Sequence, residues 1–174
     1  MSQFSTRLAA ACLAAGVLLI SNCAQLGTYD ITVNDVIVYE PTPVIKVNNV
    51  ADPALHECLQ QTAVDIEATS SSALTILNCS DAGIRSLDGL EHFAALSSIK
   101  LSGNRIRNLV VLERLGGLQQ LWLDNNDIVD PIPVLRMTTL RILNLKGNPA
   151  LQCPKATDIP SGLQLSLPSH CYSS

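Results

Sequence analysis

Residues 96–106 read LSSIKLSGNRI and residues 118–128 read LQQLWLDNNDI, so leucine, asparagine and isoleucine recur in the same order after 22 positions. The same shift extends backwards to Leu74 and forwards to Ala150. Five columns result: Leu74, Leu96, Leu118, Leu140; Leu77, Ile99, Leu121, Leu143; Cys79, Leu101, Leu123, Leu145; Ala82, Asn104, Asn126, Asn148; and Ile84, Ile106, Ile128, Ala150. Self-similarity at a fixed period of this length indicates a stack of identical structural units.

Each unit begins with a segment that alternates with a period of two. Lys100 lies between Ile99 and Leu101, so the two apolar side chains face inward and the lysine faces solvent. We therefore predict one short parallel strand per unit, followed by a return segment. The asparagine column falls where the chain turns away from the strand, and a side-chain amide there can bond otherwise unpaired backbone groups. Asn104, Asn126 and Asn148 are accordingly predicted to form a structural ladder, which Ala82 leaves imperfect in the first unit.

The unit L-x-x-L-x-L-x-x-N-x-I-x-x-L-x-x-L-x-x-L resembles a leucine-rich repeat of the 22-residue kind found in bacterial surface proteins such as the internalins. The resemblance implies an α/β solenoid, a short horseshoe with parallel strands on its concave face. Four repeats cover residues 74–151. The third repeat places Pro131 and Pro133 on its return segment, where no sheet requires their missing donors.

A solenoid exposes apolar cross-sections at both ends, and the flanking sequences are suited to cover them. Residues 51–73 are predicted to form a helical N-terminal cap, because Asp52-Pro53 is typical of a helix start. Its buried face should comprise Leu55, Cys58, Leu59, Thr62 and Ile66, which follow helical spacing. Residues 152–174 are predicted to form the C-terminal cap.

Four of the six cysteines fall in or beside these caps. Cys58 lies on the buried helix face and Cys79 in an inward column of the first strand, whereas Cys153 takes the interior position of Leu87 and Leu109. Of three possible connectivities we predict Cys58 with Cys79 and Cys153 with Cys171, which closes the C-terminal cap with a disulfide. A zinc site made of all four thiols is the alternative, but no C-x-x-C spacing supports it.

The N-terminus carries an export signal. Leu8–Ile20 is an apolar run of 13 residues, too short to span a membrane and typical of a secretory signal. Ile20-Ser21-Asn22-Cys23 resembles the lipobox of bacterial lipoproteins, which implies cleavage after residue 22 and lipidation of Cys23, although Asn22 departs from the usual small residue. The alternative is ordinary cleavage that leaves a free or paired thiol. Ala24 resembles the signal for transfer to the outer membrane, facing either the periplasm or the cell surface.

Residues 23–50 would then form a lipidated arm. Its alternation over Ile31–Val33 and Val36–Val38 permits either a tether or a short strand pair, and the tether is the preferred prediction. Loss of Arg7 with the signal leaves 10 basic residues against 15 acidic ones, a formal charge of −5. No basic run remains that would favour nucleic acid or anionic lipid.

The sequence contains no catalytic motif. His56, His92 and His170 are scattered, and there is neither H-E-x-x-H nor G-x-S-x-G. The acidic run Asp124–Asp130 suggests calcium but lacks the glycine and final glutamate of an EF-hand loop. We therefore expect no enzyme activity, no cofactor and no metal.

A binding surface is the remaining possibility. The outward strand positions form two columns on the predicted concave face: Ile76, Ser98, Gln120, Ile142; and Asn78, Lys100, Trp122, Asn144. Trp122, the one tryptophan, is predicted to be exposed, either as a partner anchor or paired with Lys100 on the neighbouring strand. The predicted contact set for a protein ligand, or less favourably a glycan, is Trp122, Lys100, Gln120, Ile142, Asn144 and Asp124, with Arg105 and Asp127 completing a polar rim.

Overall fold

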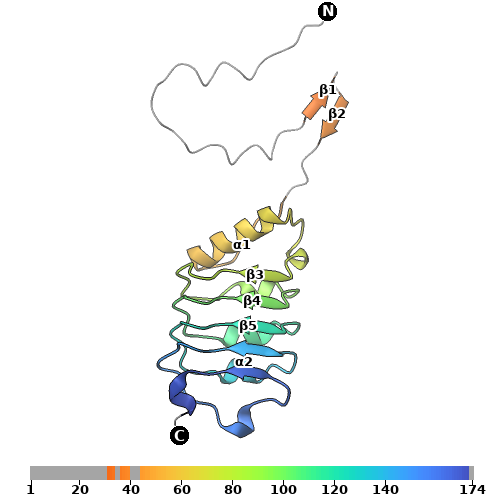
Figure 1. Cartoon of the computed structure of the whole chain (residues 1–174). Coiled ribbons are helices and arrows are strands. Elements are labelled where there is room, and N and C mark those ends of the chain that lie inside the picture. Colours follow the sequence, from red (N-terminus) through yellow and green to blue (C-terminus); the bar gives the residue numbers. More distant parts are fainter. Residues whose placement is uncertain (1–30, 34–35, 40–43, 173–174) are drawn as a thin grey trace, which may run out of the picture. The chain divides into compact units, whose positions relative to one another are not determined.

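The computed structural model describes residues 31–33, 36–39 and 44–172, and the chain divides into two compact units, 1–41 and 42–174 (Figure 1). In the first unit, strands β1 (Ile31–Val33) and β2 (Val36–Tyr39) pair antiparallel. The alternation in the arm therefore forms a strand pair, and a tether role for residues 23–50 stays a prediction. The signal sequence and Cys23 lie outside the described residues.

The second unit is built on a parallel sheet whose five strands follow chain order. These strands are β3 (Ile76–Asn78), β4 (Ser98–Lys100), β5 (Gln120–Trp122), β6 (Ile142–Asn144) and β7 (Gln164–Ser166), stacked from one end of the unit to the other (Figure 1). Each residue pairs with the residue 22 positions later, as Leu77 does with Ile99. The register confirms the repeat alignment, and the inward column from Leu77 to Leu143 has no exposed surface.

Strand β7 was not predicted, because the C-terminal cap had been separated from the repeats. Leu165 pairs with Leu143, and Gly162, Leu165, Leu167 and His170 continue the shift of 22 from Leu140, Leu143, Leu145 and Asn148. Two of these four positions lose the repeat's leucine or asparagine, which weakened the signal. The C-terminal cap is thus a degenerate fifth repeat.

The return segments carry short helices that close the core on the side away from the sheet. These are η3 (Leu90–His92), η4 (Val110–Arg114), α2 (Ile132–Leu135) and η5 (Ala156–Asp158). Leu90, Leu112 and Leu135 are buried on their inner faces. Both prolines of the third repeat fit this side, since Pro131 is the N-cap of α2 and Pro133 lies in its first turn.

The asparagine column bonds backbone groups of two consecutive turns. Asn126 Nδ2 donates to Leu101 O at 2.9 Å and Leu123 O at 3.1 Å, while its Oδ1 accepts from Ile106 N at 3.0 Å. Equivalent bonds are made by Asn104 and Asn148. All three side chains are buried, so these bonds satisfy polar backbone groups that water does not reach.

A second column is defined by backbone conformation. Asp81, Gly103, Asn125 and Gly147, which succeed one another at intervals of 22, all have φ between 56° and 71°. Side chain and glycine alternate for a steric reason: a Cβ at Gly103 would meet Asp81 Oδ1, and a Cβ at Gly147 would meet Asn125 Oδ1. Each side chain therefore occupies the space above the glycine of the next repeat.

The N-terminal cap is helix α1 (Pro53–Asp65), followed by η2 (Ser71–Ala73), and α1 is shorter than the predicted range 51–73. Its buried residues are Leu55, Leu59 and Ala63, whereas Ile66 is 50% exposed and not buried as predicted. The reason is the backbone: the helix ends at Asp65, Ile66 is its C-cap, and Glu67 then takes a left-handed conformation (φ 51°) that turns the chain away.

Residues 44–50, assigned to the arm from the sequence, pack against this helix. Gln60 accepts from Val47 N at 2.9 Å and donates to Ile45 O at 3.1 Å, and His56 Nε2 lies 3.0 Å from Val47 O. Val47 is buried in the same core as Leu55. The cap therefore begins before Asp52.

Asp52 joins the cap to the first repeat. One carboxylate oxygen accepts from Ala54 N and Leu55 N, and the other accepts from Arg85 N at 2.8 Å and Ser86 N at 3.0 Å. Burial alone would raise the pKa of Asp52, but these four backbone donors outweigh it and hold the pKa below its ordinary value.

Both predicted disulfides are present. Cys58 on α1 is bonded to Cys79 directly after β3, with Cα atoms 5.9 Å apart. Cys153 and Cys171 join the segment after β6 to η6 (Ser169–Tyr172), with Cα atoms 5.3 Å apart. Cys153 is exposed and not interior as predicted, because the buried path of this turn ends at Leu151.

Candidate interaction face

The outward side chains of the sheet form the surface that we call the strand face. Strand register places them in two columns, Ile76, Ser98, Gln120, Ile142 and Gln164, and Asn78, Lys100, Trp122, Asn144 and Ser166. The register thus brings together the predicted contact residues Trp122, Lys100, Gln120, Ile142 and Asn144 on neighbouring strands, and β7 lengthens both columns by one residue.

Trp122 and Lys100 form the centre of this face. Trp122 pairs with Lys100 across β4 and β5, and the lysine Nζ lies 5.1 Å from the centroid of the indole ring. This distance is within the range of a cation–π contact. The indole is half-buried and not fully exposed as predicted, since Lys100 covers part of it. The intramolecular pair and a role as partner anchor are compatible, because Lys100 itself is exposed.

The Asp124 carboxylate is hydrogen-bonded to neighbouring side chains and is not an unpaired charge at the rim of the face. Its Oδ1 accepts from Ser102 Oγ at 2.7 Å and from Asn144 Nδ2 at 3.0 Å, and its Oδ2 accepts from Asn125 Nδ2 at 3.2 Å. Asn144 Oδ1 in turn accepts from Lys146 N at 3.1 Å. These bonds link three consecutive repeats and fix the positions of Asp124 and Asn144 beside Trp122.

Ile76 was placed in a column but not in the predicted contact set. It is 65% exposed, the largest value among the large exposed hydrophobic side chains of the sheet. The sequence pattern could have identified it, because Ile76 occupies the outward column next to Ser98. The strand face therefore offers apolar contacts at Ile76, Trp122 and Ile142, separated by polar Ser98 and Gln120.

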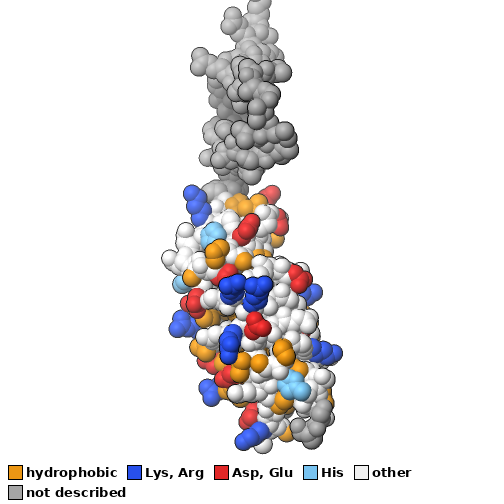
Figure 2. All heavy atoms as spheres, turned by 90° about the vertical axis from the view of Figure 1, so that its left-hand side faces the viewer, with side chains coloured by type: hydrophobic (Ala, Val, Ile, Leu, Met, Phe, Trp, Pro, Cys, Tyr) orange, Lys and Arg blue, Asp and Glu red, His pale blue; other side chains and the backbone are white. Residues whose placement is uncertain are grey.

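Charges of both signs are interspersed on the flank of the molecule that Figure 2 presents, where basic, acidic and apolar side chains alternate without a continuous field of one sign. Arg105 and Asp127, the predicted rim residues, are both exposed. Within the described residues the one ion pair joins Arg114 to Glu91, at 3.4 Å. Lys100 therefore has the Trp122 ring, and no carboxylate, as its described partner.

The remaining candidate residues are dispersed. His56 contacts Val47 in the front cap and His170 contacts Leu151 in the back cap, while His92 is exposed. In the acidic run, Asp130 Oδ1 accepts from Ile132 N at the start of α2.

Of the helices in the described parts of the chain, none combines the length and hydropathy needed to cross a bilayer.

Comparison with known proteins agrees with this architecture. No family model matches the sequence, and no curated protein does. Among solved structures, an internalin from Listeria monocytogenes shares 21% identity over 74% of this chain and 40% of its own, with a TM-score of 0.60. Internalin C2 from the same organism shares 16% identity over 72% of this chain and 57% of its own, with a TM-score of 0.59.

The chain folds as a leucine-rich-repeat solenoid. At these identities the likeness concerns the fold alone, and the chain spans about half the length of the two internalins. Leucine-rich repeats host unrelated partners, so function has to be argued from the strand face itself.

Proposed function

We propose that this chain is a non-enzymatic interaction module that binds a protein partner through the strand face. The observation that carries this proposal is the Lys100–Trp122 pair, a cation on a half-buried indole at the middle of two solvent-facing columns. Tryptophan is enriched among the residues that dominate binding energy, and a side chain already ordered by its neighbour loses little entropy on binding.

The surroundings of the pair suit a protein surface. Ile142 and Ile76 add apolar contacts, and Gln120 and Asn144 add amide groups that donate and accept hydrogen bonds. The Asp124 cluster holds this surface in one conformation, which lowers the cost of binding. A glycan ligand is less favoured, because the face has a single aromatic side chain.

We further propose that the module is exported and anchored through a lipid on Cys23 in the outer membrane. Two disulfides suit an oxidising compartment outside the cytoplasm, and the lipobox-like sequence supports the anchor. Acyl chains contribute about 0.8 kcal/mol for each buried methylene, so the several chains of a lipoprotein give a stable anchor.

Site-specific photo-crosslinking in living cells tests the proposal. A crosslinker at position 120 on β5, which leaves the Trp122 indole in place, should capture one discrete protein, whereas the same group at the exposed Val110 on η4, outside the strand face, should not capture it. Capture of the same proteins from both positions would contradict a binding site on the strand face.

A structural envelope protein or a surface adhesin without a discrete pocket is the alternative. Proteinase treatment of intact cells separates a surface-facing adhesin, which is digested, from a periplasmic scaffold, which is protected. Mass spectrometry of the N-terminal peptide tests the anchor, since lipidated Cys23 should be the first residue.

A further inference from the structure

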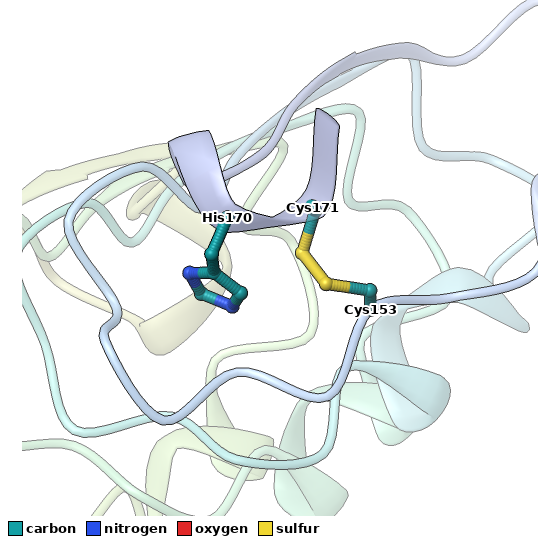
Figure 3. A group of neighbouring side chains, drawn as sticks. All are labelled: Cys153, His170 and Cys171. Carbon is teal, nitrogen blue, oxygen red and sulfur yellow. A yellow bond between two sulfur atoms is a disulfide. The ribbon is translucent and has the colours of Figure 1, made fainter. Parts of the chain in front are cut away.

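Cys153, His170 and Cys171 bring three potential metal ligands together at the C-terminal cap. Within the described residues this is the single group of three or more such side chains whose ligand atoms all lie within 4.8 Å of one another. Figure 3 shows His170 and Cys171 extending from the same short helix, η6, toward the segment that carries Cys153. Two sulfurs and an imidazole nitrogen are a donor set that suits zinc.

In the oxidised protein both sulfurs belong to a disulfide and are not available as thiolates. We propose that reduction of the Cys153–Cys171 disulfide by a dithiol converts this group into a zinc site, with both thiolates and His170 as its protein ligands. The dithiol gives two electrons and two protons to the disulfide and becomes a disulfide itself. Binding of Zn²⁺ then releases the two thiol protons, and water fills the fourth coordination position.

The exposure of the cysteines indicates which disulfide is reduced. Cys153 is exposed and Cys171 is half-buried, whereas in the other disulfide Cys58 is half-buried and Cys79 is 2% exposed, so Cys153 is the most accessible of the four. Thiol–disulfide exchange requires access to a sulfur atom, so a dithiol attacks the C-terminal bridge first. Among the residues that the structure describes, no third ligand completes such a group at the Cys58–Cys79 pair.

The local geometry requires little rearrangement to bind zinc. Bond lengths of about 2.3 Å to sulfur and 2.0 Å to nitrogen place tetrahedral donor atoms about 3.5–3.8 Å apart. The Cα atoms of Cys153 and Cys171 are 5.3 Å apart, so rotation of the two side chains separates the sulfurs without moving the backbone. His170 Nε2 lies 3.0 Å from Leu151 O and donates to it; zinc binding through Nδ1 would keep this bond, whereas binding through Nε2 would replace it.

The surface beside one of the three ligands is hollowed. A hollow of about 450 Å³ adjoins His170, and its wall is formed by Gly147, Asn148, Pro149, Pro168, Ser169 and His170. The consequence for the cap is structural. Strand β7 is only partly buried, and the bridge fixes it across 18 residues of sequence, so zinc would restore in the reduced state the cross-link that the disulfide provides in the oxidised state.

The experiment uses the full chain, reduced with dithiothreitol, desalted without oxygen and titrated with Zn²⁺ or with Co²⁺ as a spectroscopic substitute. We expect the reduced protein to bind Zn²⁺ with release of protons and to give the thiolate–Co²⁺ charge-transfer absorption. The oxidised protein should do neither. Zinc should also raise the melting temperature of the reduced protein.

Variants assign the ligands. His170→Ala, whose fold is verifiable in the disulfide-bonded state, should weaken zinc affinity by about tenfold or more, while His92→Ala, at an exposed histidine in η3, should not. Cys153→Ser/Cys171→Ser should abolish binding. Equal affinity of the His170→Ala variant and wild type, or zinc bound by the double serine variant, would overturn the proposal.

Discussion

Lys100 and Trp122 occupy the same register position on adjacent strands, with the lysine Nζ 5.1 Å from the centroid of the indole ring. The strand pairing sets this arrangement, because positions 22 residues apart stack directly. The pair places a cation and an aromatic surface at the centre of the strand face.

Trp122→Ala should remove the anchor without unfolding the protein. A hot-spot tryptophan contributes about 2 kcal/mol or more to binding, so partner affinity should fall about 30-fold. The half-buried ring fills no core position, and the free energy of unfolding should fall by no more than about 1 kcal/mol. Crosslinking yield from position 120 and the melting temperature measure the two effects. Val110→Ala, at an exposed apolar side chain on η4 outside the strand face, is the control, and a large loss of stability for Trp122→Ala would contradict its surface role.

Asn126→Ala should destabilise the solenoid strongly. The substitution leaves the amide of Ile106 without its partner, and the carbonyls of Leu101 and Leu123 each lose one of two side-chain donors, because Asn104 and Asn148 also donate to them. An unsatisfied buried group costs about 1–3 kcal/mol and each lost hydrogen bond about 1 kcal/mol, so the free energy of unfolding should fall by about 3 kcal/mol or more. Urea denaturation measures it. Asn108→Ala removes one exposed bond to Val110 N and should cost less than about 1 kcal/mol; similar losses for both variants would argue against the ladder.

Gly103→Ala should reveal the packing of Asp81 over the next repeat. The new Cβ would meet Asp81 Oδ1 at a backbone φ of 71°, so overpacking of about 1–3 kcal/mol should add to backbone strain. Gly83→Ala is the matched control, because its φ is 83° but no atom lies within 4 Å of the new Cβ. Adding Asp81→Gly to Gly103→Ala removes the side chain that the new Cβ meets. The double variant should therefore recover most of the thermal stability by which Gly103→Ala falls below Gly83→Ala. Failure of this rescue would show that the cost lies in the backbone alone.

The Asp52 carboxylate should make part of the stability depend on pH. Its pKa is lowered in the folded state, so its contribution is present above the unfolded value of about 3.9 and is lost as the pH falls through the lower folded value. Asp52→Asn keeps a helix-capping oxygen but loses the second acceptor for Arg85 N and Ser86 N, at a cost of about 1 kcal/mol near pH 7. The free energies of unfolding of wild type and Asp52→Asn, measured with urea, should converge as the pH falls below about 4. A difference that stays constant down to pH 2 would contradict this role.

The repeat columns predicted most of the fold because each column has one environment. Leu77 to Leu143 are interchangeable neighbours in one core, so a single alignment identifies them all. The same logic failed where the chain leaves the repeat path. Ile66 fits helical spacing but is the C-cap, beyond the last helical residue, Asp65, and Cys153 fits the repeat spacing but lies beyond Leu151, where the buried path of its turn ends.

The candidate site was predictable in position but not in detail. Strand alternation identified Lys100 and Trp122 as outward neighbours, yet the half-burial of the ring depends on where the lysine side chain rests. The bonds that commit Asp124 to Ser102 and Asn144 arise between repeats, and the sequence of a single repeat does not contain them. The sequence did not indicate the cluster of Cys153, His170 and Cys171. His170 stands where the other repeats carry asparagine, and this position is recognised only when the C-terminal cap is aligned as a fifth repeat.

Side chain and glycine alternate at Asp81, Gly103, Asn125 and Gly147, so the structural period of this column is two repeats and not one. Removing residues 82–103 would place Asn125 at the equivalent position of the repeat after Asp81, so that two side chains compete for one space. Removing residues 82–125 would set Gly147 there and leave the fit intact. Repeats of this chain are therefore exchangeable in pairs, and duplication or loss of coding sequence would preserve the fold most readily in steps of two.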